Sequence, residues 1–180
     1  RHWKVGPGKK VGIVGIGGLG HMGIKIAHAM GARVVAFTTS ESKRAEAHGL
    51  GADEVVISRD AAQMKAQRNS FDFILDTVAA SHDLDAFSAL LKRDGTLCLV
   101  GVPEHAHPSP NIGNLIFKRR AIAGSLTAGL NETHEPLHFC TEHGTLAEIE
   151  MVRAQDIDAA YERMLRSDVK YRFVIDAATM

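Results

Sequence analysis

Six residues near the N-terminus have the glycine spacing with which proteins bind the phosphates of a nucleotide. Gly15, Gly17 and Gly20 form a G-x-G-x-x-G pattern. In this pattern the first glycine permits a tight turn, the second leaves room for a pyrophosphate, and the third lets a helix pack closely on a strand. The amides and the dipole of the following helix favour negative charge. We therefore predict that residues 15–20 bind the pyrophosphate of a dinucleotide.

The elements around these glycines make the pattern specific. The chain has 17 glycines, so matches by chance are expected. Residues 9–14 have the composition of a short buried strand, residues 21–30 predict a helix, and residues 33–37 predict a second strand. A strand, a glycine turn, a helix and a strand within about 30 residues form the context that a dinucleotide-binding unit requires.

The residues after the second predicted strand bear on the choice between NAD and NADP. An enzyme that selects NAD normally has Asp or Glu there, about 20 residues beyond the glycines, to bind the ribose hydroxyls. This chain has Thr38, Thr39, Ser40, Lys43 and Arg44. Hydroxyls donate to a 2′-phosphate and a lysine neutralises it, whereas a carboxylate repels it. The sequence favours NADP; the alternative is that Ser40 only caps a helix and Lys43 is a surface charge.

Two groups of histidines match metal-binding patterns only in part. Residues 134–138 fit the H-E-x-x-H zinc motif, but Pro136 lies between the histidines and no third ligand is apparent. His105 and His107 lie in a Pro-containing loop, for which a solvated surface is the stronger interpretation. His21 follows the glycines on the predicted helix, where a surface histidine is the commoner case. We predict no metal site in this chain.

A short polar segment follows the predicted strand at residues 71–75. Ser81, His82 and Asp83 are neighbours in sequence, which is no evidence for a catalytic triad, and we interpret them as a helix cap. Asp76 ends the strand and could act as a base, although a positional role is as good an interpretation.

Segments that predict strands alternate with segments that predict helices along the chain. The expected strands are residues 9–14, 33–37, 54–57, 71–75, 95–101 and 121–126. The expected helices are residues 21–30, 40–47, 61–68, 82–92 and 114–119. Because such crossovers are almost always right-handed, we predict an α/β fold of the Rossmann type, a six-stranded doubly wound parallel sheet with a helix-strand tail. Its ligand should lie at the carboxyl ends of the strands, where the winding reverses.

Composition excludes several classes of protein. A chain of 180 residues suits one domain with an appendage. Its 21 basic and 21 acidic residues argue against nucleic acid or a membrane surface as the partner. Cys98 and Cys140 lie far apart, so we expect no disulfide framework and a cytoplasmic location. No apolar run reaches the roughly 20 residues of a membrane span. Trp3 and Val5, apolar residues before the first strand, hint at further chain upstream.

Seven short motifs occur in order along the chain. They are G-I-G-G-L-G-H-M-G at 15–23, S-x-x-K-R at 40–44, L-G-A-D at 50–53, D-T-V at 76–78, L-V-G at 99–101, A-G-S at 123–125 and K-Y-R-F-V-I-D at 170–176. Together they resemble the coenzyme-binding half of a zinc-type medium-chain alcohol dehydrogenase. Within that family the chain resembles the NADP-dependent cinnamyl alcohol dehydrogenases and bacterial aldehyde reductases, over essentially its whole length.

The resemblance implies roles for the matching residues. Those expected to bind NADPH are Gly15, Ile16, Gly17, Gly18, Leu19 and Gly20 at the pyrophosphate, Thr38, Thr39, Ser40 and Lys43 at the 2′-phosphate, Thr77 and Gly101 along the sheet, Ser125, Leu126 and Thr127 near the nicotinamide, and Arg172 at the phosphates. The resemblance also implies a homodimer joined edge to edge through residues 121–126, and a small aldehyde or alcohol as substrate of the parent protein.

The resemblance also identifies what this chain lacks. Members of the family hold a catalytic zinc with two cysteines and a Gly-His-Glu segment, and a structural zinc with four cysteines, all upstream of this region. We therefore expect residues 1–130 to form the NAD(P)-binding domain and residues 131–180 to form a tail that returns to an absent zinc-bearing catalytic domain. The tail should contain a helix over residues 157–165 and a strand over residues 171–175. The chain alone should bind NADPH without turning over substrate.

Two other functions remain open from the sequence. A stand-alone nucleotide-binding regulatory domain needs no catalytic residues. A methyltransferase also has glycines after its first strand, but it would want an acidic residue at the end of the second strand, where this chain has Thr38 and Thr39.

Overall fold

The main element of the fold is a six-stranded parallel sheet. The computed structural model describes residues 2–127, 129–166 and 168–180. The strands are β1 (Lys10–Val14), β2 (Arg33–Thr38), β3 (Glu54–Ile57), β4 (Phe71–Asp76), β5 (Leu91–Leu99) and β6 (Ala121–Gly124). Their order in the sheet is β3-β2-β1-β4-β5-β6, and all neighbours are parallel. This confirms the predicted doubly wound sheet, and it places the reversal of winding between β1 and β4.

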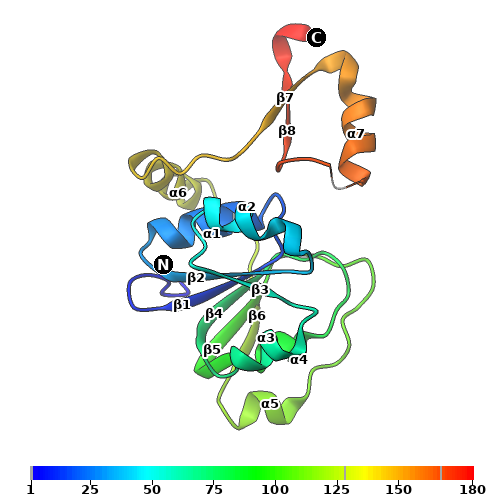
Figure 1. The fold of residues 1–180 in the computed structure, drawn as a ribbon. Helices are drawn as coiled ribbons and strands as arrows, with labels where there is room; N and C mark the ends of the chain where they lie inside the picture. The colour runs from blue at the N-terminus through cyan, green and yellow to red at the C-terminus, as the bar shows by residue number, and fades with distance from the viewer. Residues whose placement is uncertain (1, 128, 167) are drawn as a thin grey trace. The chain divides into compact units, whose positions relative to one another are not determined.

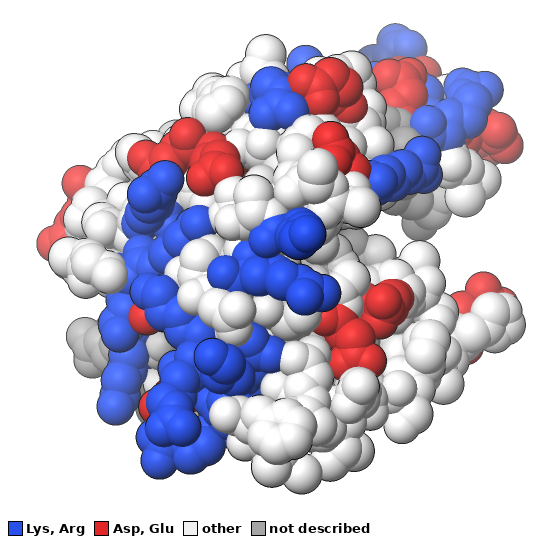
Figure 2. All heavy atoms as spheres, turned by 60° about the horizontal axis from the view of Figure 1, so that its bottom comes forward, with Lys and Arg blue, Asp and Glu red and all other residues white. Residues whose placement is uncertain are grey.

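Helices cover both faces of this sheet (Figure 1). On one face lie α1 (Gly20–Ala29) and α2 (Arg44–Gly49), the latter preceded by the short 3-10 helix η1 (Glu41–Lys43). On the other face lie α3 (Ala61–Ala66), α4 (Leu84–Ser88) and α5 (Ile112–Ile116). Figure 2 looks toward this second face, on which Lys and Arg side chains gather. The switch of face follows from the strand order, because right-handed crossovers on opposite sides of β1 place their helices on opposite faces.

The core lies between the sheet and its helices. β1, β2 and most of β4 are nearly continuous apolar segments, as expected for parallel strands covered on both faces. Phe37 on β2 packs against Phe71 on β4 and Phe87 on α4, with ring centroids 5.5 Å and 5.6 Å apart. Before the first strand, the Trp3 ring stacks on Phe73 of β4 with a centroid distance of 5.7 Å. The apolar residue at the start of the chain therefore has a partner on the sheet.

The element boundaries differ from the prediction mainly around β5. The helix expected over residues 82–92 ends at Ser88, and the strand expected from residue 95 begins at Leu91, which pairs with Phe71. Leu90 and Leu91 are both buried. Because buried leucines suit a helix and a strand equally, periodicity cannot separate the two. The strand expected over residues 121–126 ends at Gly124.

Two compact units divide the chain between Thr145 and Leu146. The first contains the sheet and α6 (Leu130–Glu142), and the second is Leu146–Met180. In the second unit, β7 (Glu150–Arg153) pairs in parallel with β8 (Phe173–Asp176), linked by η2 (Ala154–Asp156) and α7 (Ile157–Leu165), and η3 (Ala177–Thr179) follows. The helix over residues 157–165 is confirmed, whereas β7 was not predicted. The functional division at residue 130 stays a prediction. No helix of the described part has both the length and the apolar composition to cross a bilayer.

Candidate functional site

The glycine turn between β1 and α1 has the geometry that its three glycines predict. Gly15 has a φ of +88°, a conformation that strains any residue with a side chain, and its amide donates to the Phe37 carbonyl at 3.1 Å. A Cβ on Gly20 would lie 1.9 Å from the Gly15 oxygen, whereas a Cβ on Gly17 would meet nothing within 4 Å in the described chain. The first and third glycines are therefore required by the fold, and the second leaves open space beside the backbone.

The helix that follows presents the positive end of its dipole at this turn. Among the described residues no side-chain hydrogen bond caps α1 at Leu19, and its first turn holds no acidic residue. The amide of His21 donates to the Gly17 carbonyl at 3.0 Å, and His21 Nδ1 lies 3.1 Å from the same oxygen. His21 is fully buried, so its interpretation as a surface histidine is wrong. The dipole is left to favour an anion at the turn.

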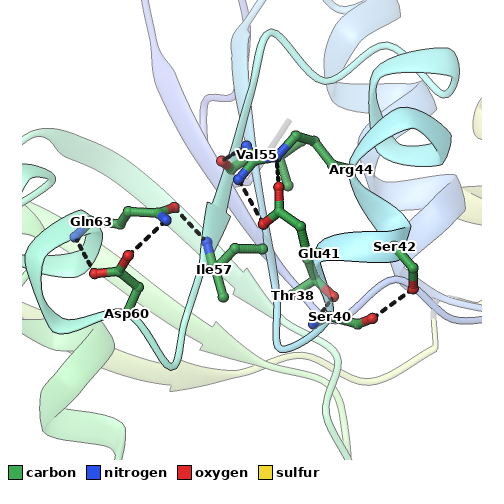
Figure 3. A network of polar contacts seen from close by, with 9 residues as sticks. All are labelled: Thr38, Ser40, Glu41, Ser42, Arg44, Val55, Ile57, Asp60 and Gln63. Carbon is green, nitrogen blue, oxygen red and sulfur yellow. Dashed lines mark hydrogen bonds and ion pairs between the residues drawn. The ribbon is translucent and has the colours of Figure 1, made fainter.

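Hydroxyl groups cluster where β2 ends (Figure 3). Thr38 is buried and its hydroxyl accepts from the Ser40 amide at 3.2 Å. The Ser40 hydroxyl lies 2.7 Å from that of Ser42, and in the described structure it makes no helix-capping hydrogen bond. Thr39 is exposed. Ser40 therefore occupies the N-cap position of η1, as the alternative interpretation predicts, but its hydroxyl contacts Ser42 and not a helix amide. The role of these hydroxyls at a 2′-phosphate stays a prediction.

The two cations after this strand have different partners. The Lys43 ammonium donates to the Ile16 carbonyl inside the glycine turn at 3.0 Å. Arg44 instead donates to both carboxylate oxygens of Glu41, at 2.6 Å and 3.1 Å, and to the Val55 carbonyl at 2.8 Å (Figure 3). The hydrogen bond from Arg44 lowers the pKa of Glu41. Lys43 is therefore the cation that joins the end of β2 to the turn.

The ends of β4 and β5 are held against the same edge of the sheet. Both the amide and the hydroxyl of Thr77 donate to the Val14 carbonyl, at 3.1 Å and 2.8 Å. A Cβ on Gly101 would lie 2.5 Å from the Val78 oxygen, so the loop after β5 can approach only because residue 101 is glycine. The structure therefore brings Thr77 and Gly101 to the carboxyl edge of the sheet, and a Cβ on Gly15 would lie 3.0 Å from the Thr77 hydroxyl.

A buried carboxylate and a histidine form a pair that sequence reasoning missed. Asp76 is 1% exposed and accepts from His82 Nε2 at 2.8 Å and from the Val78 amide at 3.1 Å. The other ring nitrogen of His82 lies 2.8 Å from the Ala80 carbonyl. The predicted cap at residues 81–83 is correct for Asp83, which accepts from the Asp85 amide. It is wrong for His82, because the loop conformation, which no residue spacing reveals, turns that ring toward Asp76.

The remaining predicted residues lie farther along the chain. The Ser125 amide donates to the Leu99 carbonyl at 3.1 Å directly after β6, and Leu126 and Thr127 are exposed. Arg172 lies in the second unit, where its carbonyl accepts from the Glu150 amide at 3.0 Å. Ser125, Leu126 and Thr127 thus lie directly after the carboxyl end of β6. Arg172 belongs to the second compact unit, Leu146–Met180.

The histidines, cysteines and carboxylates of the described residues do not come together as a zinc site. In the described ranges, no group of three or more His, Cys, Asp or Glu residues lies close enough to hold a metal ion. The H-E-x-x-H segment is helical, with Pro136 inside α6, and His134 and His138 are exposed. His138 Nδ1 lies 3.4 Å from a Glu142 carboxylate oxygen. That this motif does not bind zinc stays a prediction, which rests on the third ligand that zinc requires.

Comparison with known proteins gives one consistent relationship. Residues 18–142 match the family model described as zinc-binding dehydrogenase. The chain is 69% identical over 180 residues to an aldehyde reductase, YahK, of Escherichia coli K12, and covers 52% of that protein. It is 46% identical over 180 residues to the NADP-dependent alcohol dehydrogenase C 1 of Mycolicibacterium smegmatis, of which it covers 51%. The chain spans about half the length of the curated relatives it matches.

Solved structures agree with these matches. A cinnamyl alcohol dehydrogenase of Sorghum bicolor superposes with a TM-score of 0.93 at 43% identity, over 97% of this chain and 49% of that one. A Helicobacter pylori enzyme whose structure was determined with NADP(H) superposes with a TM-score of 0.87 at 35% identity, over 98% of this chain and 50% of that one. The fold of this chain therefore recurs as about half of longer proteins.

Proposed function

The chain belongs to the zinc-binding dehydrogenase family, as the coenzyme-binding domain of a zinc-type medium-chain alcohol dehydrogenase, and on that premise we propose that it binds NADPH for a parent aldehyde reductase. The observation that carries the proposal is the 3.0 Å hydrogen bond from Lys43 to Ile16, which holds a cation from the segment after β2 at the glycine turn. A 2′-phosphate and a pyrophosphate on one ligand need such an arrangement.

The proposed contacts follow the carboxyl edge of the sheet. Residues 15–20 hold the pyrophosphate, for which the open space at Gly17 leaves room. Thr38, Thr39, Ser40 and Lys43 hold the 2′-phosphate. The remaining proposed contacts are Thr77, Gly101, Ser125, Leu126, Thr127 and Arg172. When bound, the coenzyme supplies the hydride that reduces an aldehyde to an alcohol.

The reaction itself is proposed for the parent protein. Zinc polarises a carbonyl and stabilises the alkoxide in this class of enzyme, and the described residues here offer no ligand set for it. We infer that this chain binds coenzyme and that the zinc ligands and most of the substrate pocket come from the other half of the parent protein. A Gly-His-Glu segment and clustered cysteines in the coding sequence upstream of Arg1 would support this inference. A start codon at that point would favour the regulatory-domain alternative.

Assembly and location complete the proposal. β6 is an outer strand of the sheet, paired only with β5 in the described structure, and its residues are Ala, Ile, Ala and Gly. We propose that two copies join through this edge, which sedimentation velocity tests: a monomer at all concentrations contradicts it. Both cysteines are free, which supports a reducing cytoplasmic location.

Titration calorimetry with NADPH, NADH and S-adenosylmethionine tests the coenzyme proposal. We expect NADPH to bind at least about tenfold more tightly than NADH, because only NADPH carries the 2′-phosphate. Equal affinities would contradict the assignment of the β2 residues. Binding of S-adenosylmethionine in place of both would favour the methyltransferase alternative.

A further inference from the structure

A second charged site lies on the face of the sheet covered by α3, α4 and α5. A hollow of about 1030 Å³ opens there, and none of its lining residues comes from the glycine turn or from the end of β2. The cations that line it are Arg59, Lys65, Arg68, Lys118 and Arg120. Two carboxylates, Asp83 and Asp85, also line it. The hollow therefore carries an excess of positive charge in a chain whose formal net charge is zero (Figure 2).

In the part of the chain that the structure describes, most of these cations have no acidic partner. Within the described ranges, Arg59, Lys65, Arg68 and Lys118 form no ion pair with Asp or Glu, although such pairs are common elsewhere. The next residue along from Lys118, Arg119, pairs with Asp94 at 2.7 Å. Arg119 is neutralised by this pair, whereas the four cations of the hollow have no such pair in the described ranges, so their charge is available to a ligand.

Arg120 fixes a positive charge in the wall of the hollow. Its guanidinium donates to the carbonyl oxygens of Leu91, at 3.0 Å and 2.7 Å, and of Ala89, at 3.3 Å. It also donates to the side-chain oxygens of Asn69 and Asn114. These acceptors are all neutral, so they hold the group without cancelling its charge. Burial first, and then the nearby charge of Arg68, lowers the pKa of Arg120.

The two carboxylates of the hollow are occupied by backbone amides. Asp83 accepts from the Asp85 amide at 2.9 Å at the start of α4. Both oxygens of Asp85 accept from the Asn111 amide, at 3.1 Å and 2.9 Å. Asp83 therefore caps α4, and Asp85 holds the loop before α5. Neither carboxylate forms an ion pair with the cations of the hollow in the described residues.

We propose that this hollow binds a small polyanion, a metabolite that carries two or more phosphate groups. Arg and Lys are the residues that recognise phosphate, and here they converge from α3, from the loops around it and from the segment after α5. The volume of the hollow matches the upper range of small-molecule sites. A nucleic acid strand fits less well, because Asp83 and Asp85 interrupt the basic lining and the chain as a whole has 21 basic and 21 acidic residues.

Proton-nitrogen correlation NMR of the full chain with sodium tripolyphosphate tests the proposal. At about 0.15 M salt, where exposed charges are well screened, we expect saturable shifts at the amides of Asn69, Asn111 and Asn114. Shifts at residues 15–20 would report the coenzyme site separately, so this result does not depend on whether NADPH binds. Shifts confined to residues 15–20, or no saturation at the asparagines, would overturn the proposal.

A matched pair of double variants separates a built site from general attraction. The test variant is R68A/K118A, and the control is R93A/R166A, which removes the same charge from two exposed arginines outside the hollow. We expect the test variant to weaken tripolyphosphate binding at the asparagines about tenfold or more and the control to change it by less than about twofold. An equal loss in both variants, or tighter binding of a single-stranded oligonucleotide through the same residues, would overturn the proposal of a small ligand.

Discussion

Lys43 donates its ammonium group to the main-chain oxygen of Ile16, 3.0 Å away and 27 residues earlier in the chain. The contact joins the segment after β2 to the turn between β1 and α1. Its acceptor is a neutral carbonyl, so the charge of Lys43 is positioned without being neutralised.

Replacement of Lys43 should weaken NADPH binding selectively. In K43A the proposed 2′-phosphate loses its cation, so we expect the NADPH dissociation constant to rise about tenfold to a hundredfold and that for NADH to change less than about twofold. Titration calorimetry measures both. R44A removes the same charge one residue later, from a side chain held by Glu41 and Val55, and should leave NADPH binding nearly unchanged. A larger loss in R44A than in K43A would reverse the assignment.

Replacement by alanine should affect stability differently at two glycines of the same turn. In G20A the new Cβ would meet the Gly15 oxygen at 1.9 Å, so we expect a loss of about 3 kcal/mol or more in the free energy of unfolding. In G17A the Cβ meets open space, so stability should stay within about 0.5 kcal/mol while NADPH binding falls. Urea denaturation followed by circular dichroism measures the first effect and calorimetry the second. A stable G20A would contradict the packing account.

The acid stability of the chain should depend on Asp72. Burial alone raises the pKa of this carboxyl, but hydrogen bonds from the Lys10 amide and the Lys92 ammonium, both at 2.9 Å, outweigh it and leave the pKa lowered. A lowered pKa in the folded state gives stability that is present above the unfolded value of about 3.9 and is lost as the pH falls through the folded value.

Urea midpoints measured between about pH 6 and pH 2 test this account. We expect D72N to be less stable than the unmutated chain at pH 6 and to lose less stability on acidification. The exposed Glu104 provides the control, because the stability of E104Q should depend on pH as that of the unmutated chain does. Parallel curves of urea midpoint against pH for D72N and the unmutated chain would show that Asp72 does not cause the loss of stability in acid.

The two thiols should differ in reactivity. Cys98 is fully buried on β5, and burial raises the pKa of its thiol, whereas Cys140 on α6 is partly exposed. Because the thiolate is the reactive form, iodoacetamide at neutral pH should modify Cys140 first and Cys98 only after denaturation. Peptide mass mapping over time measures both sites, and C140S isolates the slow one. Similar rates in the folded chain would contradict the burial of Cys98.

The sequence predicted the sheet well because its strongest signals are local. Most strands are short apolar runs, β5 with its charged residues 92–94 being the exception. The glycine pattern fixed where the first strand turns into a helix. Helices on both faces of the sheet followed from the alternation of elements and the handedness of crossovers. The place of the reversal, between β1 and β4, came only from the strand order in the structure. Boundaries failed where residues suit two structures, as Leu90 and Leu91 do at the end of α4.

Contacts between distant segments could not be predicted in the same way. The pairing of Asp76 with His82 and the burial of His21 depend on loop and packing geometry, which a residue pattern does not encode. The cationic hollow could not be predicted from the sequence for a similar reason. Its residues come from three separate parts of the sequence and converge only after α3, α4 and α5 have packed on the sheet.

The stacking of Trp3 on Phe73 has a practical consequence for spectroscopy. The chain has 1 tryptophan, so its indole emission comes from a single known place. Detachment of the leading segment from β4 would expose that ring to water and move its fluorescence to longer wavelength. The chain therefore carries an intrinsic optical probe of its first residues, and no dye has to be attached.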